Sequence, residues 1–166
     1  MPTLYYASMN PQKISILFVC HGNICRSPMA EFVMKDLASR EGLGQFFHIE
    51  SAATSSEELG NPIHPGTARK LDSLGIDYSE KRARRIRKND YENFDFLIGM
   101  DEANMRSIRN LYNNDPENKV RKLLEYAGSS ADVADPWYTH DFESCFQDVC
   151  DGCTGLMNEL CRKLLH

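Results

Sequence analysis

Short apolar runs alternate with helical patterns along most of this chain, and the alternation limits the folds open to it. The apolar runs are bounded by polar or turn residues, as buried strands usually are: ISILFVC (14–20), HIESAAT (48–54), FDFLIGM (94–100) and, more weakly, VRKLLEY (120–126). Segments with helical spacing lie between these runs, at 29–39, 65–75 and 101–112. Strands that alternate with helices predict an α/β fold whose parallel sheet is covered on both faces.

The last segment, from about Phe142 to Leu165, has apolar residues at three- and four-residue spacing, which predicts a long amphipathic helix. Cys150 and Cys153 form a C-x-x-C pair within it, a pattern that also occurs in zinc and redox sites. Both cysteines fall on the apolar stripe, and no second pair of ligands follows at zinc-site spacing. We therefore predict core packing for both cysteines and no metal.

The chain of 166 residues is long enough for one domain with a sizeable core. We expect residues 14–166 to form it, and residues 1–13 to be a loosely ordered N-terminal extension. Hydrophobic residues make up 42% of the chain, yet no window approaches the ~20 apolar residues of a membrane span. No signal-peptide core precedes the first strand, and the six cysteines follow no disulfide framework. These features predict a soluble, cytoplasmic protein with reduced thiols.

The net charge of −5 disfavours binding to nucleic acid, although one short segment has the opposite sign. The segment KRARRIRK, residues 81–88, holds six basic residues in eight. A segment of this kind is more often a solvated surface. The alternative is a local field that attracts anionic substrates.

The stretch CHGNICRSP, residues 20–28, lies where the first predicted strand becomes a helix. Anions bind at such places in open α/β sheets, because free backbone N–H groups and the helix dipole converge there. The spacing C-x-x-x-x-x-R lets the N–H groups from His21 to Arg26 point at a phosphoryl group, with the Arg26 guanidinium donating to two of its oxygens. The Cys20 sulfur would then face the phosphorus in line with the leaving oxygen.

The neighbours of Cys20 suit this chemistry. The loop amides, the helix terminus and Arg26 are expected to stabilise the thiolate, which is the nucleophilic form of cysteine. Gly22 and Asn23 suit a tight curl, because both tolerate a positive φ better than most residues.

Two further residues of the loop fit the start of a helix. Ser27 is expected to cap the helix and to hydrogen-bond the thiolate, and Pro28 fits a first helical turn. A buried structural cysteine would explain Cys20 alone but not its neighbours. A Walker nucleotide-binding loop is excluded, because no G-x-x-x-x-G-K-[ST] occurs.

Phosphoryl transfer to sulfur also needs an acid that protonates the departing phenolate or alkoxide. The best candidate is Asp135 in the stretch ADPWY, residues 134–138. Pro136 stiffens the loop, while Trp137 and Tyr138 offer apolar walls that favour the protonated acid and stack on an aromatic substrate. On its own, Asp-Pro is usually only a turn signal.

With these residues identified, the chain resembles the low-molecular-weight protein tyrosine phosphatase family from about Ile14 to Leu165. The motifs LFVCHGNICRSPMAE, SAATS, GNP, GID, FDFLIGMDEAN and DPWY occur in the family's order and at its approximate spacings. The resemblance implies a three-layer α/β fold, with a four-stranded parallel sheet flanked by helices and the phosphate-binding loop between strand 1 and helix 1. It also implies hydrolysis of phosphotyrosine in protein substrates through a cysteinyl-phosphate, with no cofactor and no metal, by a monomer or weak homodimer.

The resemblance assigns roles to individual residues. Cys20 is implied to be the nucleophile, Arg26 to bind the phosphate, and Asp135 to act first as acid and then as base. The residues implied to contact the substrate are His21, Gly22, Asn23, Ile24, Cys25, Ser27, Trp137 and Tyr138. Cys25 is further implied to form a protective disulfide with an oxidised Cys20.

The resemblance implies that Asn23, Ser27 and Ser51 hold the loop by hydrogen bonds. Two positions depart from the family pattern. Lys81 stands where many members carry histidine just before the RAR segment, which leaves this bracing network open. Glu57 stands where many members carry an aromatic or large apolar residue after SAATS, which leaves the substrate preference open.

Three other functions fit parts of the pattern. A thioredoxin-coupled arsenate reductase has a similar fold and loop but needs two further cysteines for a disulfide relay, and none occurs between Cys25 and Cys145. A protein arginine phosphatase is associated with threonine at the position of Ile24, where isoleucine favours phosphotyrosine. A phosphotyrosine-binding module without turnover is disfavoured, because the three implied catalytic residues are all present.

Overall fold

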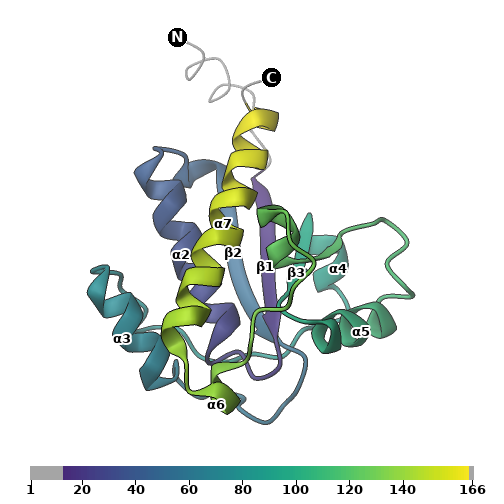
Figure 1. Ribbon diagram of the computed structural model, residues 1–166. Helices are drawn as coiled ribbons and strands as arrows, with labels where there is room; N and C mark the ends of the chain where they lie inside the picture. The colour runs from purple at the N-terminus through teal and green to yellow at the C-terminus, as the bar shows by residue number, and fades with distance from the viewer. Residues whose placement is uncertain (1–12, 165–166) are drawn as a thin grey trace.

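The computed structural model describes residues 13–164, which form a parallel sheet with helices on both faces (Figure 1). Within that range the strands are β1 (Ile14–Cys20), β2 (Phe47–Ala53), β3 (Phe96–Gly99) and β4 (Val120–Lys122), in the order β2-β1-β3-β4. All three neighbouring pairs are parallel. The predicted α/β fold with a four-stranded parallel sheet is therefore confirmed.

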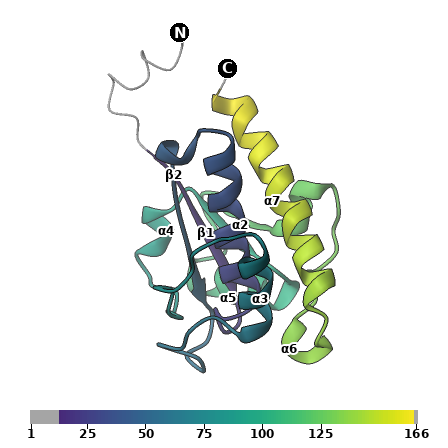
Figure 2. The same ribbon diagram turned by 90° about the vertical axis from the view of Figure 1, so that its left-hand side faces the viewer.

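The side chains of β1 alternate between two cores, because successive residues of a strand point to opposite faces. Ile16, Phe18 and Cys20 belong to the core under α2 (Arg26–Arg40), α3 (Pro65–Ser73) and α7 (Phe142–Leu164). The other core, which includes Leu17 and Val19, lies under α4 (Asp90–Asn93) and α5 (Glu102–Leu111). Figure 2 shows the two groups of helices on opposite sides of the sheet.

The helix boundaries follow local signals. Pro65 is the first residue of α3, where its missing N–H costs no hydrogen bond, and Gly75 takes a positive φ of 68° just beyond the helix end. The side chain of Asp101 accepts the N–H of Asn104, which fixes the start of α5. Short 3₁₀ helices, η1 (Gly44–Phe46) and η2 (Leu123–Ala127), and the short helix α6 (Pro136–Thr139) complete the described elements.

The prediction of a strand over 120–126 is wrong in its second half. Lys122 pairs with Gly99, the last residue of β3, so the backbone beyond Lys122 has no neighbouring strand to pair with. The chain therefore turns into η2, which buries Leu123 and Leu124.

The long C-terminal helix is confirmed as α7. Cys153 is buried on its inner face, and Cys150 is half-buried against the same core, as predicted. Among residues 13–164, no cluster of three or more His, Cys, Asp or Glu side chains is placed to hold a metal ion. None of the helices in this range is both long and apolar enough to span a membrane. The predicted N-terminal extension, apart from Lys13, and Leu165 lie outside the described residues.

Candidate active site

Cys20 ends β1 and Arg26 begins α2, so residues 20–26 form the loop between the central strand and the first helix. The Cys20 side chain is almost buried, since the residue is 3% exposed. Its sulfur accepts the backbone N–H groups of Asn23 (3.3 Å) and Ser27 (3.4 Å), and it lies 3.0 Å from the Ser27 hydroxyl. The sulfur is thus surrounded by two backbone donors and one hydroxyl group.

The backbone of this loop differs in detail from the expectation. Asn23 takes the positive φ, at 59°, whereas Gly22 does not adopt a positive φ. Glycine at position 22 serves close packing instead, because a Cβ there would lie 3.3 Å from Cγ of Glu58. The expected positive φ at Gly22 was therefore wrong.

Ser27 does not cap α2. It is the second residue of the helix, and no side chain caps the helix N-terminus at Cys25. The hydroxyl of Ser27 turns toward the Cys20 sulfur and also accepts a hydrogen bond from Asn23 Nδ2 at 2.8 Å. Two roles were predicted for Ser27, a helix cap and a contact with the Cys20 sulfur. Only the second is present, because the hydroxyl is engaged by Cys20 and Asn23.

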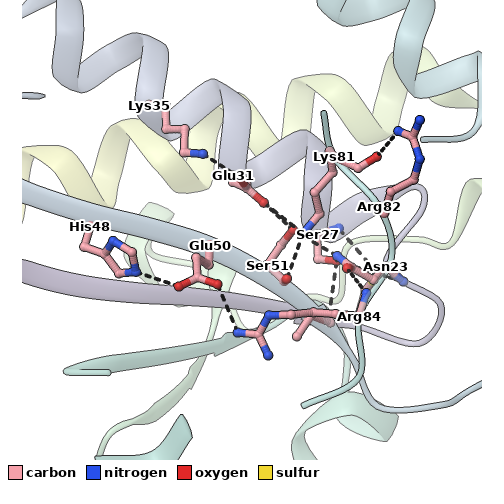
Figure 3. A network of polar contacts seen from close by, with 12 residues as sticks. Asn23, Ser27, Glu31, Lys35, His48, Glu50, Ser51, Lys81, Arg82 and Arg84 are labelled. Atoms are coloured by element: carbon pink, nitrogen blue, oxygen red, sulfur yellow. Dashed lines mark hydrogen bonds and ion pairs between the residues drawn. The ribbon is translucent and has the colours of Figure 1, made fainter. Parts of the chain in front are cut away.

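A bracing network, made of the buried residues Asn23, Ser27, Glu31 and Ser51 and the partly buried Lys81, lies behind the loop (Figure 3). Asn23 Nδ2 donates to the hydroxyls of Ser27 (2.8 Å) and Ser51 (2.9 Å). The Ser51 hydroxyl in turn donates to Glu31 Oε1 at 2.6 Å. These bonds join the loop to β2 and α2, which are rigid elements of the fold.

Lys81 completes this network from a neighbouring segment. Its ammonium group donates to the Ser51 carbonyl oxygen at 2.9 Å and lies 3.3 Å from Glu31 Oε1. Burial lowers the pKa of Lys81, and the Glu31 carboxylate opposes that shift. The network is therefore intact with lysine at this position.

Arg26 is fixed from one side. The residue is 2% exposed, and its NH1 group donates to Asp101 Oδ2 at 2.7 Å and to the Val133 carbonyl oxygen at 2.8 Å. Its NH2 group donates to Asp135 Oδ2 at 3.3 Å. Burial disfavours the guanidinium charge, but the negative groups Cys20, Asp101 and Asp135 outweigh burial and raise the pKa of Arg26.

Asp135 lies at the start of α6, with one carboxylate oxygen accepting the N–H of Trp137 at 3.0 Å. The other oxygen lies 3.3 Å from Arg26 NH2, so the candidate acid is in direct contact with the arginine that is expected to bind phosphate. Trp137 and Tyr138 follow it and are 52% and 77% exposed. Both aromatic rings are thus accessible to a molecule that approaches Cys20.

A single cleft unites most of the predicted site residues. Its lining comprises Cys20, His21, Gly22, Ile24, Cys25, Arg26, Glu57, Glu58, Asp135, Trp137 and Tyr138. Asn23 and Ser27, which were expected to contact the substrate, are absent from this lining, because they are buried behind the loop in the bracing network. At the cleft rim, Glu57 Oε2 lies 3.0 Å from His21 Nε2.

Two residues of the site were missed by sequence reasoning. Glu58 lines the cleft beside Gly22, and the only signal in the sequence was its position next to Glu57. Asp101, between β3 and α5, binds the Arg26 guanidinium. Its signal was its place directly after the third apolar run, because parallel strands bring their carboxyl ends to one edge.

The fold and the loop define a class of α/β protein in which a strand-loop-helix unit holds a nearly buried cysteine in a cleft that an arginine and an aspartate also line. Residues 15–165 match the family model of the low molecular weight phosphotyrosine protein phosphatases, which describes the sequences of that family. The chain belongs to this family. The predicted family is therefore confirmed.

Individual relatives agree with this assignment. The chain is 41% identical over 146 residues to the low molecular weight protein-tyrosine-phosphatase YfkJ of Bacillus subtilis (strain 168), covering 87% of this chain and 94% of that protein. The crystal structure of YfkJ matches with a TM-score of 0.89 at 38% identity, over 93% of this chain and 98% of that one. The crystal structure of the Streptococcus pyogenes low molecular weight protein tyrosine phosphatase has a TM-score of 0.79 at 40% identity, over 89% of this chain and 93% of that one. A Drosophila arginine phosphatase has a TM-score of 0.81 at 25% identity, with 87% and 96% covered.

Proposed function

We propose that this protein hydrolyses phosphotyrosine in proteins in two steps, through a phosphocysteine at Cys20. The observation that carries the proposal is the Cys20 sulfur, which accepts two backbone N–H groups and contacts the Ser27 hydroxyl in a cleft that also contains Arg26 and Asp135. The relatives named above as tyrosine phosphatases support the same substrate class.

In the first step, the Cys20 thiolate forms a bond to phosphorus as the bond from phosphorus to the tyrosine oxygen breaks. The departing phenolate takes a proton from Asp135, which lines the cleft and contacts Arg26 NH2, whereas Asp101 contacts NH1. Arg26 and the loop amides stabilise the charge on the transferred phosphoryl group.

In the second step, the Asp135 carboxylate accepts a proton from water as the water oxygen attacks phosphorus. The bond between sulfur and phosphorus breaks, which releases inorganic phosphate and restores the thiolate. Every atom needed for the cycle comes from the protein, the substrate and water.

The hydrogen bonds of Arg26 suggest how phosphate enters. Asp101 and the Val133 carbonyl oxygen hold NH1, whereas NH2 has the longer contact, 3.3 Å, with Asp135. A phosphate dianion that binds NH2 replaces the Asp135 carboxylate there. Asp135 is then free to face the leaving oxygen, while Arg26 keeps its orientation.

Phosphotyrosine is expected to be the preferred substrate over phosphoarginine. Ile24 lines the cleft beside the loop, where an apolar side chain favours an aromatic ring over a polar guanidinium. The test compares kcat/KM for one peptide sequence that carries phosphotyrosine, phosphoarginine or phosphoserine, with and without EDTA. A preference for phosphoarginine would assign the protein to the arginine phosphatases, and loss of activity in EDTA would contradict direct attack by sulfur.

Glu57 is expected to reduce the rate on peptides with acidic residues beside the phosphotyrosine. Its carboxylate at the rim repels such peptides, as an exposed charge contact worth ~0.2–1 kcal/mol would. Glu57→Gln should therefore raise kcat/KM for acidic over basic peptides about 1.4- to 5-fold at low salt. Glu92→Gln, on the opposite side of the sheet, is the matched control. An unchanged ratio in Glu57→Gln would leave this carboxylate without a role in selection.

We further propose that residues 14–166 act as one cytoplasmic phosphatase domain, a monomer or weak homodimer without nucleic-acid or membrane partners.

Cys25 is expected to protect Cys20 against oxidation. All six cysteines are free, and burial raises the pKa of Cys25, which keeps it a thiol in the loop that follows Cys20. Peroxide would oxidise Cys20 to a sulfenic acid, and Cys25 would then form a disulfide with it and release water. After peroxide treatment, an added thiol should restore activity to the wild type but not to Cys25→Ser. Equal recovery of activity in the two proteins would refute this protection.

A further inference from the structure

The loop that carries Asp135 is exposed along most of its length. This acid loop, residues 128–135, begins at Gly128 with a φ of 78° and leads from η2 to α6. Figure 1 shows it as a long connection without secondary structure that ends at α6. Val133 is its one fully buried residue. The position of Asp135 therefore depends on a small number of contacts along the loop.

Lys122 makes a charged contact with the acid loop outside the cleft lining. Its side chain is 7% exposed, and the ammonium group donates to the Ser130 carbonyl oxygen at 2.6 Å and to Asp132 Oδ1 at 2.9 Å. A third contact, at 2.8 Å, joins it to Glu102 Oε1 at the start of α5. All three donors of the ammonium group are thus used, two of them on the acid loop. Hydrogen bonds with Glu102 and Asp132 raise the pKa of Lys122, so it stays charged.

The loop is also held at its start, where the Ser129 N–H donates to the Leu124 carbonyl oxygen at 3.0 Å, and near its end at Val133 and Asp135. The N–H of Val133 donates to the Met100 carbonyl oxygen at 2.8 Å, and Arg26 binds both the Val133 carbonyl oxygen and the Asp135 carboxylate. In the mechanism proposed above, phosphate replaces Asp135 at Arg26. The acid then loses its contact with Arg26 at the moment when its position matters most, and the contacts at 129, 130, 132 and 133 have to hold the loop.

We infer that Lys122 is a positioning residue for the general acid, holding the acid loop so that Asp135 stays over Cys20 while the leaving group departs. Lys122 does not line the cleft and touches neither Cys20 nor Arg26. It acts from the carboxyl end of β4, a rigid element, through two contacts with the loop. The inference rests on the role proposed for Asp135.

The test measures kcat/KM for a series of aryl phosphates whose leaving phenols range from acidic to weakly acidic. This ratio reports the step in which the phenol leaves. Lys122→Met should lower it on the order of 10- to 100-fold for the poorest leaving groups, because a displaced acid no longer reaches the oxygen. Good leaving groups need little protonation, so their rate should change little. Inhibition by inorganic phosphate should also stay unchanged.

A double variant separates positioning from general damage. In an Asp135→Asn background no acid remains to be positioned, so adding Lys122→Met should cause no further loss. Lys119→Met is the matched control, because this lysine lies directly before β4 and binds the Tyr91 carbonyl oxygen and Glu117, away from the acid loop. It should leave the leaving-group dependence unchanged.

Asp132→Asn gives a second variant in case Lys122→Met fails to fold, since the Asp132 side chain is 46% exposed. It should change the leaving-group dependence in the same direction by a smaller factor. Equal losses on all leaving groups, or the same added loss in the Asp135→Asn background, would overturn the inference. If Asp135→Asn showed no dependence on the leaving group, the role of Asp135 and this inference would both fall. If Asp135→Asn lost most activity on poor leaving groups, while the Lys122 and Asp132 variants showed no loss that depends on the leaving group, this inference alone would be overturned.

Discussion

Cys20→Ser is expected to lower the turnover of aryl phosphates by a factor on the order of 10⁴ or more. A serine hydroxyl has nearly the same size and can accept the same N–H groups of Asn23 and Ser27. It ionises far less readily than a thiol, however, and so offers phosphorus no comparable nucleophile. Steady-state rates with p-nitrophenyl phosphate measure the loss.

Two controls make the result for Cys20 specific. Phosphate binding should persist in Cys20→Ser, because Arg26 and its partner Asp101 are unchanged, and calorimetry can measure it. Cys161→Ser, near the far end of α7, removes a thiol outside the site and should leave the rate unchanged. Substantial turnover in purified Cys20→Ser would contradict attack by sulfur.

Asp135→Asn is expected to slow the release of poor leaving groups by about 10²–10⁴-fold. Asparagine keeps the size of the side chain and can still accept the N–H of Trp137, so α6 should begin at the same residue. It has no acidic proton to give to a phenolate. Substrates with very good leaving groups should therefore lose much less, and kcat/KM across a series of phenols measures the difference.

Asp141→Asn serves as the control for this variant, because Asp141 accepts hydrogen bonds from Ser144 and lies outside the cleft lining. It should leave both classes of leaving group unaffected. An equal loss for good and poor leaving groups in Asp135→Asn would exclude proton donation by this carboxyl. Phosphate should bind Asp135→Asn at least as tightly as the wild type, because asparagine has no charge that competes with phosphate at Arg26 NH2.

The parts of the fold that depend on local patterns could be predicted from the sequence. Burial of β1 and its change into α2 follow from one apolar run, one loop and one helical pattern, all adjacent in the chain. The same locality places Cys20 and Arg26 on one loop. The end of β4 could not be predicted in this way, because it depends on where its neighbour β3 stops, at Gly99.

Details within the loop depended on distant residues. The roles expected of Gly22 and Ser27 came from general preferences of glycine and serine. In the structure Glu58 packs against Gly22, and Asn23 binds Ser27 while reaching Ser51 on β2. These partners come from segments that approach the loop only when the sheet has formed.

For residues that act on the site from other strands, the sequence around each residue does not show which partner it reaches. Asp101 reaches Arg26 because β3 pairs with β1, and Lys122 reaches the acid loop because β4 pairs with β3. Each lies at or just beyond the carboxyl end of its strand, where parallel strands meet. Sequence spacing alone gives neither the strand order β2-β1-β3-β4 nor these contacts.

The central claim, attack by Cys20 on phosphorus, is tested most directly by trapping its product. Wild-type protein turning over p-nitrophenyl phosphate is stopped with denaturant after successive short times, digested, and analysed by mass spectrometry. We predict a single phosphoryl group on the peptide that contains Cys20, formed as fast as nitrophenol is first released. Nitrophenol release at full rate with no phosphoryl group on Cys20, or with the group on another residue, would contradict the account.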